Sequence, residues 1–86
     1  MNNAAEIDKS VLIKNDTSDA KVTLFIYSAH DPLCWLSFSS KIIEPGKTYL
    51  YRSRDSFKFE LRAHGEKSKR KIMQPVKNGK RQPHVL

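Results

Sequence analysis

Cysteine and glycine are scarce in this chain, and each shortage excludes a class of site. The 86 residues include one cysteine, Cys34, so neither an internal disulfide nor a metal site built from several cysteines can form. The three glycines lie too far apart for a glycine-rich phosphate loop. A deep catalytic cleft is not expected either, because a chain of this size forms only one modest core.

Long apolar runs are also missing. No stretch approaches the roughly 20 apolar residues that a membrane-spanning helix needs. The first ten residues, MNNAAEIDKS, have neither the basic start nor the apolar centre of a secretory signal. Together with the free cysteine, this favours a reducing intracellular setting, cytoplasmic or nuclear. The sequon Asn15-Asp16-Thr17 would then stay unmodified, since it matters only in an exported chain.

The clearest positive signal is strand-type alternation. From Phe57 to Ala63 every odd position is apolar and every even one charged, which predicts a strand with one buried face. A second strand is expected at 21–27. For these two strands we expect a buried face of Val22, Leu24, Ile26, Phe57, Phe59 and Leu61, with Lys58, Glu60 and Arg62 in water.

Turn residues divide the rest of the chain into short segments. Asn, Asp, Ser and Thr cluster at 15–19, and Glu44-Pro45-Gly46 fits a type II turn. Further strands are expected at 11–13, 35–39 with its continuation at 42–43, and 48–52, with Trp35 filling the core. Residues 72–76 are expected to form an edge strand or none, because Pro75 lacks an amide donor.

These segments predict an all-β protein. The spacing favours a small antiparallel β-sandwich or open barrel of six to seven short strands, with a basic C-terminal tail. We expect a flexible N-terminus at 1–8, the sandwich domain at 9–76 and the tail at 77–86.

Chemistry-bearing residues are few. Cys34 lies near His30 and Asp31, but its immediate neighbours are apolar, which predicts a buried, unreactive thiol. The three histidines occupy separate segments without a zinc-binding spacing. We therefore expect a protein that is not an enzyme and has no cofactor, no metal and no small-molecule substrate.

Aromatic and basic residues suggest one candidate face. Tyr49 and Tyr51 share a side of one strand, and Arg52, Arg54 and Arg62 lie close by in the predicted fold. Aromatic rings beside cations can stack bases and hold phosphates. Alternatively, the tyrosines cap the core with their rings buried.

The positive charge is concentrated at the C-terminal end. Residues 1–64 carry nine basic and eight acidic side chains, whereas residues 65–86 carry seven basic side chains and one acidic. We call the main group the basic strip: Lys67, Lys69, Arg70, Lys71, Lys80 and Arg81. Such asymmetry points to an anionic partner, and each contact with a phosphate would add affinity by releasing counterions.

The sequence thus favours a non-catalytic binding module. Its partner would be nucleic acid or an acidic membrane surface, held by the basic strip, with Arg52, Arg54 and Arg62 as extensions on the sheet. The alternative is a protein-interaction or assembly domain that uses an edge strand or the tyrosine face. In that case the basic strip would be a linker or a nuclear localisation signal.

Overall fold

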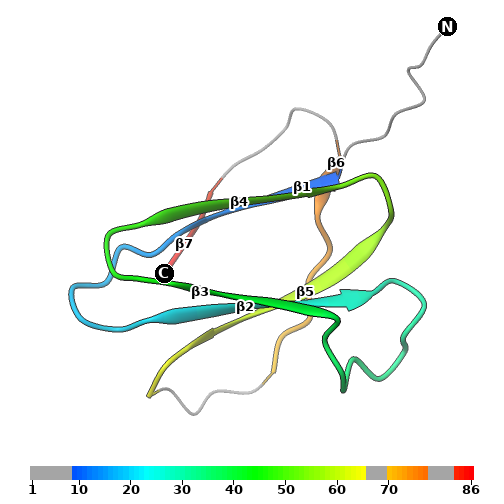
Figure 1. The fold of residues 1–86 in the computed structure, drawn as a ribbon, viewed down its shortest axis with the longest axis horizontal. Coiled ribbons are helices and arrows are strands. Elements are labelled where there is room, and N and C mark those ends of the chain that lie inside the picture. Colours follow the sequence, from blue (N-terminus) through cyan, green and yellow to red (C-terminus); the bar gives the residue numbers. More distant parts are fainter. Residues whose placement is uncertain (1–8, 66–69, 78–82) are drawn as a thin grey trace, which may run out of the picture.

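A computed structural model describes residues 9–65, 70–77 and 83–86 and shows an all-β fold, as predicted (Figure 1). Five strands have five to seven residues each and two are very short. In chain order they are β1 (Lys9–Lys14), β2 (Val22–Ser28), β3 (Ser39–Ile43), β4 (Thr48–Ser53), β5 (Phe57–Ala63), β6 (Val76–Lys77) and β7 (His84–Val85).

The strands form two small sheets that stack as a sandwich (Figure 1). In the first sheet β1 lies between β4 on one side and β6 and β7 on the other; β7 runs parallel to β1 and the other pairs are antiparallel. In the second sheet β2 lies between β3 and β5, both antiparallel to it. We refer to these as the β1 sheet and the β2 sheet.

The core fills the space between the sheets. Its buried side chains come from the inward faces of β1, β2 and β5 and from the end of β3: Val11, Ile13, Leu24, Ile26, Ile43, Phe57 and Phe59. Phe59 lies at its centre, tilted against Phe57 and edge-on to the His84 ring. Burial of such large side chains between two layers is what stabilises a domain of this size.

The alternation at 57–63 gave the strand and its inward face correctly. On β5, Phe57 and Phe59 are buried and Leu61 is half-buried. On β2, Val22, Leu24 and Ile26 are fully buried, as predicted. Glu60, however, was expected in water and is 2% exposed, so that prediction is wrong. The outward face of the β2 sheet is covered at this point by other parts of the chain.

The expected strand at 35–39 is also wrong for all but its last residue. β3 begins at Ser39, and residues 29–38 form a loop. Trp35, expected in the core, is 74% exposed. Ile42 and Ile43 do belong to β3, as expected, and Ile43 faces the core.

The turn between β3 and β4 has the predicted type II geometry. The Lys47 amide donates to the Glu44 carbonyl at 3.1 Å, and Gly46 takes a φ of +80°. A positive φ at the third position defines this turn and favours glycine.

Asn15 fixes the corner after β1. It is fully buried; its side-chain amide donates to the carbonyls of Ala20 at 2.8 Å and Ile43 at 2.9 Å. Its side-chain oxygen accepts from the amide and hydroxyl of Thr17. The sequon asparagine is therefore a structural residue with every side-chain polar atom engaged.

Residues 70–77 cross from one sheet to the other. Met73 exchanges two backbone hydrogen bonds with Phe59 at the edge of β5, and β6 then pairs with the start of β1 (Figure 1). This crossing segment closes one side of the sandwich. It also agrees with the edge position expected near Pro75.

The last residues are paired as well. β7 lies along the second half of β1, and Leu86 exchanges backbone hydrogen bonds with Lys14 and Asp16. Of residues 77–86, which the sequence predicts as the basic tail, Lys77 lies in β6 and residues 84–85 form β7, both paired with β1. The remaining residues of the expected tail, 78–82, and the expected flexible segment 1–8 lie outside the described residues.

Within the described ranges, no helix is long and apolar enough to cross a membrane.

Candidate binding site on the loop between β2 and β3

The loop between β2 and β3 carries large apolar side chains in water. Trp35 is 74% exposed and Leu36 83% exposed, and Leu33 and Phe38 are also mostly exposed. We call these four side chains the apolar loop. Figure 1 shows the loop leaving the end of β2 and folding back to β3 beyond the layers of the sandwich. Contiguous exposed apolar groups on a small domain mark an interaction site.

Backbone contacts within the loop hold it in shape. The Asp31 amide donates to the Ser28 carbonyl at 3.1 Å, and the Phe38 amide donates to the Ile26 carbonyl at 3.0 Å. Cys34 is buried at the middle of the loop, and its thiol lies 3.4 Å from the Asp31 carbonyl oxygen. Its φ of +51° is unusual for a residue other than glycine. The loop keeps this strained conformation because contacts on both sides fix it.

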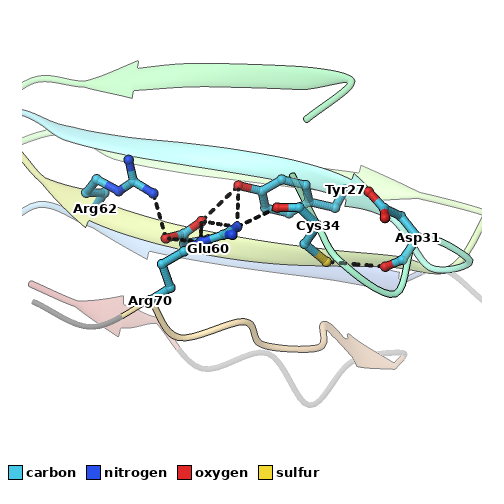
Figure 2. A network of polar contacts seen from close by, with 6 residues as sticks. All are labelled: Tyr27, Asp31, Cys34, Glu60, Arg62 and Arg70. Carbon is cyan, nitrogen blue, oxygen red and sulfur yellow. Dashed lines mark hydrogen bonds and ion pairs between the residues drawn. The ribbon is translucent and has the colours of Figure 1, made fainter. Parts of the chain in front are cut away.

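A polar cluster on the outward face of the β2 sheet anchors the loop (Figure 2). Arg70 donates to both carboxylate oxygens of Glu60 at 3.0–3.3 Å and to the Cys34 carbonyl at 2.5 Å. Tyr27 donates its hydroxyl proton to Glu60 at 2.8 Å and accepts a bond from Arg70 at 3.1 Å. Arg62 donates to the other oxygen of Glu60 at 2.9 Å. The cluster thus joins β2, β5, the crossing segment and the loop.

Glu60 is ionised within this cluster. Burial raises the pKa of its carboxyl, but hydrogen bonds from Arg70, Arg62 and Tyr27 outweigh burial and hold the pKa below its ordinary value. Burial and the neighbouring Glu60 carboxylate raise the pKa of Tyr27. The phenol therefore stays protonated and serves as a donor to the carboxylate.

A shallow hollow lies beside the cluster, lined by Phe25, Tyr27, Trp35, Ser37, Arg62 and Arg70. The Arg62 guanidinium lies 5.0 Å from the centre of the Phe25 ring, and that of Arg70 lies 5.7 Å from Tyr27. Two arginines face one carboxylate here, so the hollow next to Trp35 carries a net positive charge.

The predicted anion-binding residues divide into three groups. Arg62 and Arg70 meet at Glu60, so Arg70 is not the freely solvated cation that the sequence suggested. Arg52 on β4 and Arg54 in the following turn are exposed on other parts of the sandwich, and Lys71 is exposed beside Arg70. The remaining predicted contacts lie outside the described residues: Lys67, Lys69, Lys80 and Arg81.

The tyrosine face is used in packing. Tyr49 and Tyr51 are half-buried against the core, and the Tyr51 ring meets Phe57 edge-on with ring centres 4.9 Å apart. Lys41 from the other sheet lies over Tyr49, 5.4 Å from the ring centre. Both rings therefore contribute to packing, which agrees with the alternative that the tyrosines cap the core.

The nearest arrangement to a catalytic site is a groove at the end of the sandwich. His30 and Asp55 line it with three serines and with Phe38, Tyr51 and Phe57 at its apolar side. In the described part of the chain, no hydrogen bond joins the His30 ring to a serine or to Asp55. Cys34 is buried, as predicted, and its sulfur faces a backbone carbonyl instead of a histidine. No group of three metal-ligating side chains occurs among the described residues.

Comparison with protein-family models, with curated proteins and with solved structures gave no match for this chain.

The apolar loop and the Glu60 cluster could not be predicted from the usual rules, by which apolar residues are buried and charges on a strand face are exposed. Trp35 and Leu36 break the first rule and Glu60 breaks the second. A signal for the loop was present in Asp31-Pro32, which follows β2 closely and precedes a run without clean alternation. Nothing in the run KSKRK distinguishes Arg70 from its neighbours.

Proposed function

We propose that this protein is a non-catalytic binding module that engages an anionic partner, nucleic acid or an acidic membrane surface. The supporting observation is the charge distribution, with six of the seven net positive charges within residues 65–86. Lys71 is exposed next to Arg70 in the sequence, and the hollow lined by Arg62 and Arg70 carries further positive charge. Phosphate groups are the chemical partner that such a surface favours.

The structure changes how this proposal is tested. Arg70 bonds to Glu60 and to the loop, so its replacement would disturb the fold as well as any binding. Lys69 and Lys71 are the better positions, since each is a basic residue beside Arg70 in the basic strip.

The experiment is a titration with duplex DNA, single-stranded RNA and acidic vesicles over a salt series. If five basic residues contact the phosphates of duplex DNA, log affinity should fall against log salt with a slope of about −4 to −5. Replacing Lys69 and Lys71 by Ala should reduce this slope by about 1.8.

A control variant separates local contacts from net charge. Lys14 and Lys47 are exposed at the end of β1 and in the turn after β3, and replacing both by Ala removes the same charge. The control should change the slope much less. Absence of binding to all three polyanions at low salt would refute the proposal and leave the protein-interaction alternative.

A further inference from the structure

The four side chains of the apolar loop are exposed to water, which is unfavourable for apolar groups. Leu33, Trp35, Leu36 and Phe38 are each more than half exposed, and all lie within six consecutive residues. Single exposed apolar residues are ordinary, but a group of this kind on one loop marks a contact surface. A tryptophan with leucines beside it suits the boundary between water and lipid, where the ring can lie among headgroups and the aliphatic chains below them.

The loop is presented in a fixed shape. Its middle is tied to the β2 sheet through Arg70 and the Cys34 carbonyl, and Lys58 donates to the Asp31 carbonyl at 3.1 Å. The apolar side chains therefore extend from an ordered backbone, and little ordering entropy is lost when they enter a partner.

The loop and the basic strip are directly connected. Arg70 belongs to the strip by sequence and touches the loop at Cys34 (Figure 2). The positive hollow is lined by Trp35 as well as by Arg62 and Arg70. Apolar groups and cations side by side complement an acidic bilayer, which offers hydrocarbon below a layer of negative headgroups. A basic segment alone binds such a surface weakly, and stable attachment needs a second signal.

Two other occupants fit these observations less well. A second copy would bring one net charge of +7 against another. Duplex DNA would satisfy the cations but offers no apolar phase to Leu33 and Leu36. On the basis of the proposed function, we infer that the anionic partner is an acidic lipid bilayer and that the apolar loop inserts into its surface.

Trp35 is the only tryptophan of the chain and therefore reports on the loop by its own fluorescence. The experiment compares phosphatidylcholine vesicles with and without phosphatidylserine, and duplex DNA. With phosphatidylserine vesicles, Trp35 emission should shift to shorter wavelength and become protected from acrylamide quenching. DNA and neutral vesicles should leave the emission unchanged.

Variants locate the effect. Replacing Leu33 and Leu36 together by Ser should lower affinity for the acidic vesicles by at least about tenfold, since each leucine loses apolar burial. Affinity for DNA and the melting temperature should not change, because both side chains are exposed in the free protein. Leu50→Ser, at an exposed position on β4, is a single-leucine control and should bind vesicles like the parent.

The outcomes distinguish the two proposals. Vesicle binding without a change in Trp35 emission, or with full affinity in the Leu33 and Leu36 variant, would overturn insertion but keep anion binding. Binding to DNA alone would overturn the membrane partner. Self-association that the Leu33 and Leu36 variant abolishes, measured by sedimentation equilibrium, would assign the loop to a second copy. Failure to bind any polyanion would refute both proposals.

Discussion

Glu60 is a buried carboxylate on the outward face of the β2 sheet, and its burial depends on polar partners from three parts of the chain. Arg62 comes from the same strand, Tyr27 from β2 and Arg70 from the crossing segment. Taking an ionised group out of water is costly unless every oxygen is paired. Both oxygens of Glu60 are paired here, so the carboxylate links β5 to β2 and to the crossing segment.

Replacing Glu60 by Gln should lower the free energy of unfolding by about 1–3 kcal/mol at neutral pH, because charge-assisted hydrogen bonds become neutral ones. The folded pKa of Glu60 is lower than its ordinary value of 4.5. Its contribution is therefore complete above pH 4.5 and is lost as the pH falls from there through the folded pKa. Urea denaturation of parent and variant across this range measures the difference, which should shrink in acid.

Glu44→Gln is the control for that measurement. Glu44 is exposed and lies 3.9 Å from Lys21, so its removal should change stability by less than about 0.5 kcal/mol. A difference between parent and Glu60→Gln that stays constant down to the lowest pH would contradict the role given to ionised Glu60.

Among the elements, the strands and turns with local chemical signals were predictable. The alternation at 57–63 and the Pro-Gly pair at 45–46 are local patterns, so neighbouring residues are enough to predict the strand and the turn. The loop at 29–38 was not predictable, because its apolar residues are of the types found in a buried strand. The polar cluster holds this loop at Cys34, and the partners in that cluster are up to 43 residues apart.

The same limit applies to the candidate site. The concentration of positive charge in residues 65–86 follows from a count of charged residues in the sequence. It did not separate Arg70 from the lysines around it, because the difference lies in a contact with a strand ten residues earlier. Lys58 and Glu60 lie on the same face of β5, yet only Glu60 is fully covered.

The β3–β4 turn gives a test at the level of one element. Gly46 has a φ of +80°, and no atom lies within 4 Å of the place where a Cβ would be added. Gly46→Ala should therefore cost only the backbone penalty, about 1–2 kcal/mol in the free energy of unfolding. Gly46→Asn should cost less, because asparagine tolerates this conformation better. Thermal melting of both variants checks the order; an alanine variant as stable as the parent would show a different turn.

Among the described residues, the sandwich is closed on one side and open on the other. The crossing segment, β6 and β7 cover one side, whereas β3 and β4 present their outer edges on the other, joined by the short turn (Figure 1). Open edges attract other strands, and charge is a common protection against this. Lys41 on β3 and Arg52 on β4 are exposed there.

The closing role of β7 predicts that the last three residues matter for stability. Deleting His84, Val85 and Leu86 removes the pairing with β1, two backbone hydrogen bonds of Leu86 and the edge-on contact of His84 with Phe59. The free energy of unfolding should fall by about 1–3 kcal/mol. Val85→Ser should have little effect, because that side chain is mostly exposed. A truncated chain with an unchanged urea midpoint would show that β7 is dispensable.

The buried corner at Asn15 has a consequence for sugar attachment. An oligosaccharide on its side-chain nitrogen would need the atom that donates to Ala20 and Ile43, and it would need space where none exists. The glycan and this fold are mutually exclusive at that residue. If the chain met a glycosylating enzyme, modification would compete with folding. A folded molecule would remain unglycosylated, and a glycosylated molecule could not form the turn after β1.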